Sequence, residues 1–310
     1  MNTINKIVVS SDTSPMFLNY WPVVAQSWKE IFNLVPTLVL VAPLSFDKSI
    51  ISRLRDFGEV EVVEVLTDVP EANQAKLSRW FYACQQKSLV VSIEDIDTIF
   101  LSSDFLEDRL REFDPSKLLG IGSEVYDYQE GLMKFPASNL TGSGDLFAKL
   151  FGYRDEMTFN DFVEQFKNSK IFDELEDPYK SPKYFSDESL IRALRSLNKF
   201  NDIKVIERNI DIRAKWLDRS WWPSNSSFDI SQYTTVNFLR PLRENFESCR
   251  KVIEIFFPTD YPWIIDQKTP ISKNRDHIVR RLPSELRYAI LNRLRKLEAH
   301  KIGLVSKFRN

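Results

Sequence analysis

The stretch VVSIEDIDTIFLSSDF, residues 90–105, carries three carboxylates in the middle of an apolar, mostly β-branched run. A buried strand does not hold unpaired charges, because moving a charge out of water costs far more free energy than one apolar contact returns. Glu94, Asp95 and Asp97 therefore mark a point where the chain faces either solvent or a cation. We predict a strand over residues 88–101, with these acids directly after its buried part, VVSI.

Strands and helices alternate on the N-terminal side of this stretch. Apolar runs predict strands at 6–11, 36–43 and 59–66, and apolar residues at helical spacing predict helices at 17–32, 46–58 and 71–86. Such alternation is typical of an α/β fold in which helices cover both faces of a parallel sheet. Ligands of such sheets bind beyond the carboxyl ends of the strands, which is where the acids fall.

The second half of the chain is less regular. The pattern predicts helices at 158–166, 184–198 and 239–257 and a strand at 204–210. Residues 273–310 hold eleven Lys or Arg and three Asp or Glu, and a helix is predicted at 283–303. We therefore predict a domain over residues 1–257 and a basic, helical C-terminal extension over 258–310 that packs on it. The extension is expected to expose a solvated face, and the alternative is peripheral contact with anionic lipid or an acidic partner.

Composition excludes several classes of function. A formal net charge of −2 argues against a general nucleic-acid binder. Two cysteines and two histidines exclude a cysteine-rich zinc site and a multi-histidine metal cluster. The eight glycines form neither a GxGxxG nor a P-loop motif. Without a signal peptide or a membrane-length apolar run, we expect a cytoplasmic protein with no transmembrane segment.

Asp95 and Asp97 form an Asp-x-Asp pair. Residues i and i+2 of an extended segment point the same way, so both carboxylates can face one ligand. Oxygen ligands of this kind suit Mg²⁺ or Mn²⁺, and a bound cation would neutralise a diphosphate leaving group. The alternative is a solvated acidic turn in which Asp97 caps the next element of the chain.

Several short motifs, taken in order, resemble the GT-A-fold glycosyltransferases, and more narrowly the glycosyltransferase domains of large DNA viruses and some microbes. Besides the Asp-x-Asp pair, they are SSDTSPMFLNYWPVVAQSW (10–28), AKLSRWFYA (75–83), ASNLTGSGDLF (137–147), YFSDESL (184–190) and VNFLRP (236–241). The resemblance implies a Rossmann-like mixed sheet flanked by helices. It also implies a nucleotide-sugar donor and Mn²⁺ or Mg²⁺ bound by Asp95 and Asp97.

Two positions depart from that pattern. The resemblance implies an Asp-x-His shortly before Arg-Pro, but this chain has Thr235 and Asn237 there. The histidine would complete the metal shell, and Asn237 offers only an amide oxygen, a neutral and weaker ligand. Glu94 stands where the pattern has serine.

The predicted nucleotide contacts come from the end of the first strand and from one helix. Ser10, Ser11 and Asp12 end the first strand, so they share an edge with Asp95 and can contact a base or ribose. Their alternative role is a turn that caps the next helix. Arg79 can bind a diphosphate bidentately, and its alternative is a solvated helix face.

Other candidates lie further along the chain. Gly142 and Ser143 belong to the one glycine-dense loop, where backbone can approach a sugar closely, unless the loop is an ordinary turn. Asp187 and Glu188 follow Ser186, which is normal chemistry for a helix start. The resemblance implies instead that one of them is the general base. Arg213, Arg219 and Arg240 are candidates to neutralise phosphate.

The resemblance, together with the residues that carry it, implies a metal-assisted, inverting hexosyl- or deoxyhexosyltransferase. It would move a sugar from a UDP- or GDP-linked donor to a hydroxyl of a glycan acceptor. One alternative is a non-catalytic GT-A-like protein that binds a glycan or a partner, which the Asn237 departure favours. The other is a sugar-phosphate nucleotidyltransferase, but SSDTSPMFLNYW lacks the glycine- and basic-rich loop that such an enzyme uses for triphosphate.

Overall fold

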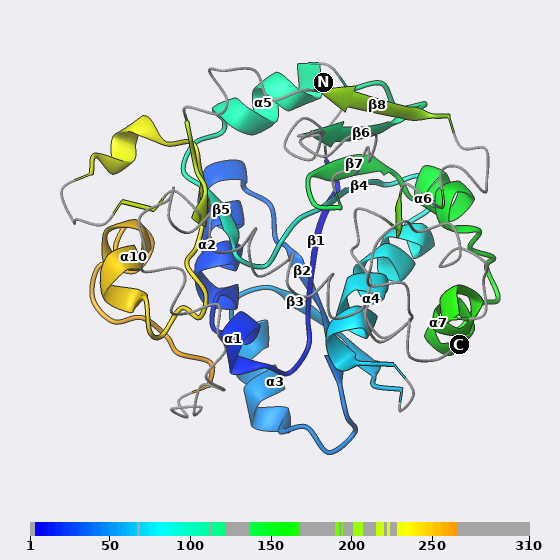
Figure 1. Ribbon diagram of the computed structural model, residues 1–310, viewed down its shortest axis with the longest axis horizontal. Coiled ribbons are helices and arrows are strands. Elements are labelled where there is room, and N and C mark those ends of the chain that lie inside the picture. The colour runs from blue at the N-terminus through cyan, green and yellow to red at the C-terminus, as the bar shows by residue number, and fades with distance from the viewer. Residues whose placement is uncertain are drawn as a thin grey trace, which may run out of the picture. The chain divides into compact units, whose positions relative to one another are not determined.

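The chain is organised around a mixed β-sheet with helices on both faces (Figure 1). The computed structural model describes residues 4–66, 69–111, 113–121, 137–167, 190–191, 194, 201–206, 215–219, 222–223 and 228–265. Within them the large sheet has seven strands, in the order β3 (Glu59–Glu64), β2 (Thr37–Ala42), β1 (Lys6–Ser11), β4 (Val90–Ile93), β7 (Leu140–Ser143), β6 (Leu118–Ile121) and β8 (Ile203–Ile206). β7 runs antiparallel to both of its neighbours, and the other pairings are parallel.

A smaller sheet joins β5 (Thr98–Phe100), β10 (Thr235–Asn237) and β9 (Trp216–Leu217). β10 lies between the other two, antiparallel to β5 and parallel to β9. It therefore brings the segment that precedes Arg240 against the segment that follows Asp97.

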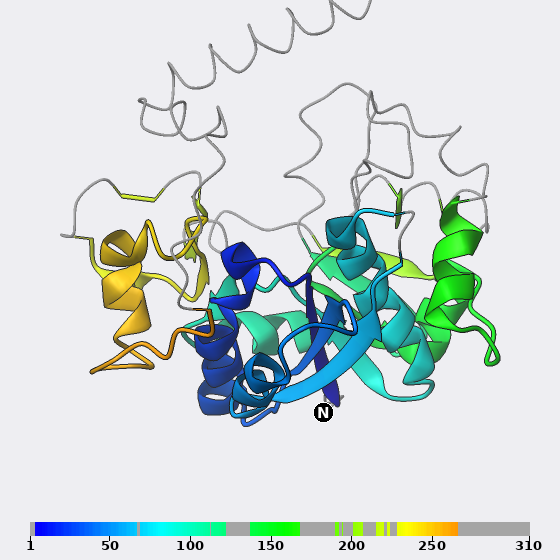
Figure 2. The ribbon, with the colours of Figure 1, turned by 90° about the horizontal axis from the view of Figure 1, so that it is seen from below.

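The helices of the described chain divide between the two faces of the large sheet. They are α1 (Pro15–Leu18), α2 (Trp21–Phe32), α3 (Lys48–Arg55), α4 (Glu71–Gln85), α5 (Asp104–Arg111), α6 (Gly144–Phe151), α7 (Phe159–Lys167) and α10 (Phe246–Ile253). Figure 2 shows from a second direction that α10 and α7 lie on opposite sides of the sheet. The predicted α/β class, a mixed sheet flanked by helices, is confirmed.

Two apolar cores hold these layers together. Ile7 and Val9 of β1 are buried in the same core as Trp28 of α2 and Val252 of α10. Val8, which points the other way because side chains alternate along a strand, is buried in a second core with Trp80 of α4. The ring of Trp80 stacks on that of Phe151 in α6, with centroids 4.7 Å apart.

Three predicted elements differ from the structure. The single strand predicted at 88–101 is two strands, β4 and β5, in different sheets. The helix predicted at 17–32 is divided into α1 and α2, and α2 begins beside Pro22, which suits the first turn of a helix because it has no N–H to donate. The helix predicted at 239–257 begins at Phe246, since Pro241 does not fit a helix interior.

The described chain continues past the predicted domain boundary at residue 257. Tyr261 and Ile264 are buried in the core that contains α2. The hydroxyl of Tyr261 donates to the carbonyl of Asn19. Residues 266–310, with the helix predicted at 283–303, lie outside the described residues.

Candidate active site

The carboxyl ends of β1 and β4 form one edge of the large sheet. The two strands are parallel, with Val8 opposite Ile93, and the N–H of Glu94 donates to the carbonyl of Val8 at 2.9 Å. Ser11 at the end of β1 and Asp95 just after β4 therefore lie at the same edge, as predicted from the strand pattern.

The acids of the EDID sequence occupy the turn between β4 and β5. β4 ends at Ile93 and β5 begins at Thr98. Thr98 pairs with Asn237 of β10, and the N–H of Phe238 donates to the carbonyl of Asp97 at 2.8 Å. The charged residues thus interrupt the apolar run because the chain leaves one sheet there and enters the other.

Three arginines meet the two aspartates of this turn. Oδ2 of Asp97 pairs with Nη1 of Arg219 at 2.8 Å and with Nε of Arg240. Oδ1 of Asp95 pairs with Nη1 of Arg79 at 2.9 Å. We name Arg79, Arg219, Arg240, Asp95 and Asp97 the arginine–aspartate cluster.

Burial and charge act against each other within the cluster. Burial alone would raise the pKa of Asp95, but the charges of Arg79 and Arg240 outweigh it, and the pKa lies below its ordinary value. Burial likewise opposes the charged form of Arg240, but the carboxylate of Asp97 raises the pKa of that arginine above its usual range. Both residues are therefore held in their charged forms.

Aromatic side chains support Arg240. Its guanidinium lies over the ring of Phe17, 5.1 Å from the centroid. Tyr20 donates its hydroxyl to the carbonyl of Leu239, the residue before Arg240. Burial, together with the charge of Asp97, raises the pKa of Tyr20 well above its ordinary value. The tyrosine is therefore a neutral hydrogen-bond donor that fixes the backbone beside Arg240.

The side chains predicted to hold Mn²⁺ or Mg²⁺ do not together fit a divalent-cation site. Asp95 and Asp97 each give one carboxylate oxygen to arginine. The amide oxygen of Asn237 accepts a hydrogen bond from Nε1 of Trp216. Among the described residues, no group of three or more His, Cys, Asp or Glu side chains is placed to hold a metal ion. Oδ1 of Asp97 is buried and has no hydrogen-bond partner in the described chain.

The residues at the end of β1 make local contacts. Oγ of Ser11 donates to the carbonyl of Asp12 at 2.7 Å, and Oδ1 of Asp12 accepts from the N–H of Ser14 at 3.0 Å. Ser14 in turn caps α1. Burial raises the pKa of Asp12. The turn-capping alternative is thus present, and Ser10, Ser11 and Asp12 also lie at the edge where a ligand is expected.

Arg79 lies deeper than the prediction of a diphosphate contact implies. Its side chain is 6% exposed, and Nη1 also donates to the carbonyl of Glu94 at 3.3 Å. The alternative role, a solvated helix face, does not fit this burial. The sequence pattern did not indicate that Arg79 is buried, because its partner, Asp95, belongs to a different element, the turn after β4.

Gly142 and Ser143 lie away from the acids, because β7 runs antiparallel to β4. Because β7 is antiparallel to β4, Ser143 lies opposite Val90, at the far end of β4 from Asp95. A Cβ at Gly142 would lie 2.2 Å from Cδ2 of Leu118, so close packing explains that glycine. Ser143 caps α6 by accepting from the N–H of Leu146 at 3.3 Å.

The same antiparallel register brings Asn139 to the edge that carries the acids. Leu140 lies opposite Ile93, and Asn139 precedes it in a left-handed conformation with φ 59°. Asn139 is 4% exposed, and its Oδ1 has no hydrogen-bond partner in the described chain. Sequence reasoning missed it, although the quoted loop ASNLTGSGDLF contains it.

A buried polar chain connects β4 and β7 beneath the acids. Oγ of Ser92 donates to Oε1 of Glu94 at 2.7 Å and lies 2.8 Å from Oγ1 of Thr141. Glu94, the residue that departs from the family pattern, is fully buried. The hydroxyl of Ser92 satisfies Oε1, one of the two oxygens of this buried carboxyl group.

Two predicted catalytic residues, Asp187 and Glu188, lie outside the described residues, as does Arg213. Their role as general base stays a prediction.

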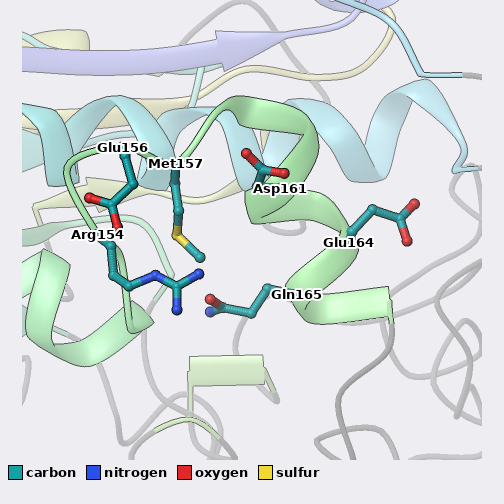
Figure 3. Close-up of a pocket in the computed structure, with 6 residues that line it drawn as sticks. All are labelled: Arg154, Glu156, Met157, Asp161, Glu164 and Gln165. Atoms are coloured by element: carbon teal, nitrogen blue, oxygen red, sulfur yellow. The ribbon is translucent and has the colours of Figure 1, made fainter.

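A separate hollow of about 630 Å³ lies beside α7. It is lined by Arg154, Glu156, Met157, Asp161, Glu164 and Gln165 (Figure 3). Two of its polar groups serve local structure, since Asp161 accepts from the N–H of Thr158 and Gln165 donates to the carbonyl of Phe151.

In the part of the chain that is described, none of the helices combines the length and apolar character needed to cross a bilayer.

Comparisons with known proteins find matches to this chain among solved structures. Neither a protein-family model nor a curated protein matches the chain. The galactosyltransferase LgtC, in complex with donor and acceptor sugar analogues, is 13% identical, with a TM-score of 0.47 over 87% of this chain and 99% of its own. The glycosyltransferase GlyE of Streptococcus pneumoniae TIGR4 is 15% identical, with a TM-score of 0.43 over 87% of this chain and 67% of its own. At these scores and identities, neither match assigns a function to the chain.

Proposed function

We propose that this chain is a glycosyltransferase that moves a sugar from a nucleoside-diphosphate sugar to a hydroxyl of a glycan acceptor. The observation that carries the proposal is the arginine–aspartate cluster at the carboxyl edge of β1 and β4. This edge is where parallel sheets bind ligands, and guanidinium groups there suit an anionic diphosphate. The ordered motifs of the sequence support the same interpretation.

The proposed donor site uses residues from both sheets. Ser10, Ser11 and Asp12 would contact the base or ribose, and Asp95, whose side chain is 31% exposed, would accept a hydrogen bond from a donor hydroxyl. Arg240 would contribute positive charge to the diphosphate. The base and sugar, with UDP- and GDP-linked hexoses or deoxyhexoses as candidates, remain predictions.

The proposed reaction is a single displacement. The acceptor oxygen attacks the anomeric carbon, the bond from that carbon to the diphosphate oxygen breaks, and the hydroxyl proton passes to a carboxylate. Asp187 or Glu188 is the predicted acceptor of this proton, and direct attack inverts the anomeric configuration. Preorganised guanidinium groups would stabilise the charge that develops on the departing nucleotide.

A non-catalytic protein that binds a glycan or a partner is the second candidate. It is favoured by Asn237, which stands where the resemblance implies a histidine. The amide oxygen of Asn237 is already engaged by Trp216. Such a protein would retain a nucleotide or glycan site but would not turn a donor over.

Release of nucleoside diphosphate from a panel of UDP- and GDP-sugars, with mixed glycan acceptors, tests the proposal. One donor is expected to be consumed with formation of a glycan product. Asp95→Asn should lower the rate by about 10- to 100-fold, because the donor hydroxyl loses a charged hydrogen-bond acceptor. Asp155→Asn is the control, because Asp155 is 71% exposed in an ion pair with Lys87, and the rate should stay unchanged.

Binding of one nucleotide without turnover of any sugar donor would favour the non-catalytic candidate. If the chain neither binds a nucleotide nor turns over a sugar donor, the proposal itself is contradicted.

A further inference from the structure

We propose that Arg219 and Arg240 bind the donor diphosphate directly, so that donor binding needs no divalent cation. In this arrangement Asp97 anchors the two guanidinium groups and is not a metal ligand. The inference rests on the proposed function, since it concerns how the same site holds its donor.

The charges of the cluster support this arrangement. Two carboxylates, Asp95 and Asp97, meet three guanidinium groups, and each carboxylate already pairs with at least one of them. A divalent cation placed between the carboxylates would face these positive charges at close range, where repulsion is strong. A diphosphate placed there would instead be attracted to them.

The guanidinium groups of Arg219 and Arg240 keep donors for a ligand. Arg240 contacts Asp97 through Nε, and Arg219 contacts it through Nη1. A guanidinium carries five N–H donors in a planar fork, so further N–H groups remain on each side chain. The side chains of Arg240 and Arg219 are 29% and 25% exposed, which leaves them within reach of a bound anion.

Arg79 has a different role within the cluster. It is almost buried and donates to both the side chain of Asp95 and the carbonyl of Glu94. It therefore positions the EDID turn. The two partly exposed arginines of the cluster are the ones available to phosphate.

Asp97 fixes the two guanidinium groups in advance of binding. Its side chain is 0% exposed, and its carbonyl accepts from the N–H of Phe238. The buried position of Asp97 lets one oxygen of its carboxylate, Oδ2, orient two guanidinium groups. Groups that are already oriented lose little conformational freedom when a ligand arrives.

The test is calorimetric titration of the full chain with UDP and GDP, once in EDTA and once with added Mn²⁺. We expect one of the two nucleotides to bind in EDTA with a Kd within about threefold of its value in Mn²⁺. Arg219→Gln should weaken that binding by about tenfold, as loss of one charge-assisted contact does. Binding of the matching nucleoside, which lacks phosphate, should weaken by less than about twofold in the same variant.

Arg250→Gln is the matched control, because it removes the same charge from an exposed pair with Glu247 on α10, and it should leave Kd unchanged. Arg219→Gln leaves Asp97 paired with Arg240, and thermal unfolding of the variant checks that it folds. If it does not fold, Arg219→Lys, which keeps the charge and loses the fork, should give an intermediate Kd.

Nucleotide binding that requires Mn²⁺ would overturn this inference and leave the proposed function standing. Equal binding by wild type and Arg219→Gln in EDTA would also overturn it. Absence of nucleotide binding in both buffers would contradict the proposed function, and the inference with it.

Discussion

Asp97 is the residue on which the local structure of the candidate site depends. Its side chain is fully buried, and one of its oxygens is shared by Arg219 and Arg240. Removing one partner from a buried charge pair is costly, because the remaining charge stays out of water without compensation. The stability of the turn and the proposed binding of the donor therefore depend on the same contacts.

Replacing Arg240 with methionine should lower the free energy of unfolding by about 2 kcal/mol, because the buried carboxylate of Asp97 loses one of its two guanidinium partners. Methionine keeps an apolar side chain but loses the guanidinium, and with it both the pairing with Asp97 and the contact with the ring of Phe17. Urea unfolding measures the change. Arg250→Met, at an exposed ion pair, should stay within about 0.5 kcal/mol of wild type. Equal effects of the two variants would show that Asp97 does not depend on Arg240.

The pairing of Asp95 predicts a loss of stability in acid. Its folded-state pKa is depressed, because the charge of Arg79 outweighs the opposing effect of burial. The contribution is therefore complete above the ordinary pKa of aspartate and is lost as pH falls through the folded-state pKa. The difference in free energy of unfolding between wild type and Asp95→Asn, measured by urea unfolding from about pH 6 to about pH 3, should shrink toward low pH. A difference that stays constant would contradict the pairing.

At the scale of elements, the decisive feature is the change of sheet at the EDID turn. The apolar pattern correctly indicated where strand residues lie, but it joined β4 and β5 into one strand. Periodicity reports burial and not the identity of the partner strand, and β5 pairs with β10, which lies far along the chain. The acids themselves were the local signal for the break.

The sequence pattern did not indicate the direction of β7 either. The loop 137–147 was interpreted as one candidate contact with sugar, but its two ends lie at opposite ends of β4. Asn139 reaches the acidic edge, and Gly142 and Ser143 do not. Glycine content alone pointed to the part of the loop that lies away from the acids, because close packing and ligand approach both favour glycine.

Packing at the start of α6 gives a prediction for this element. A Cβ at Gly144 would lie 2.3 Å from the backbone nitrogen of Lys87 and 2.7 Å from the carbonyl carbon of Gln86. Gly144→Ala should therefore destabilise the chain by about 2 kcal/mol, because backbone must move to admit the methyl group. Asp145→Ala, at an exposed neighbouring position, should cost less than about 1 kcal/mol. Thermal or urea unfolding of both variants measures this, and a neutral Gly144→Ala would contradict the packing.

At the scale of the whole molecule, the alternation of strands and helices in the first hundred residues predicted the α/β class and the edge on which the acids lie. It did so because the strands there are short apolar runs and the helices carry apolar residues at helical spacing. The arginine partners of Asp97 could be named only as phosphate candidates, since their contacts join distant parts of the chain. A divalent-cation site was expected from Asp95, Asp97 and Asn237. The sequence did not indicate that arginines pair with the two aspartates or that a tryptophan donates to the asparagine.

The core extends beyond the domain boundary predicted at residue 257. Ile264 is 1% exposed, and the N–H of Ile265 donates to Oδ1 of Asn19 at 2.9 Å. A chain shortened after Phe257 should therefore be less stable than one shortened after Asp266, by about 3 kcal/mol or more, because buried apolar side chains are lost. Urea unfolding of the two shortened chains compares them. Equal stability would support the boundary predicted from sequence.

The central claim is that a nucleotide binds at the carboxyl edge of β1 and β4. Hydrogen–deuterium exchange of the full chain, with and without saturating UDP or GDP, tests it most directly, because bound ligand slows exchange of the backbone that it orders. We expect protection in peptides that contain residues 10–14, 94–97 and 237–241. Peptides that cover residues 154–165, which line the hollow beside α7, should be unchanged. Protection confined to residues 154–165, or no protection anywhere, would contradict the claim.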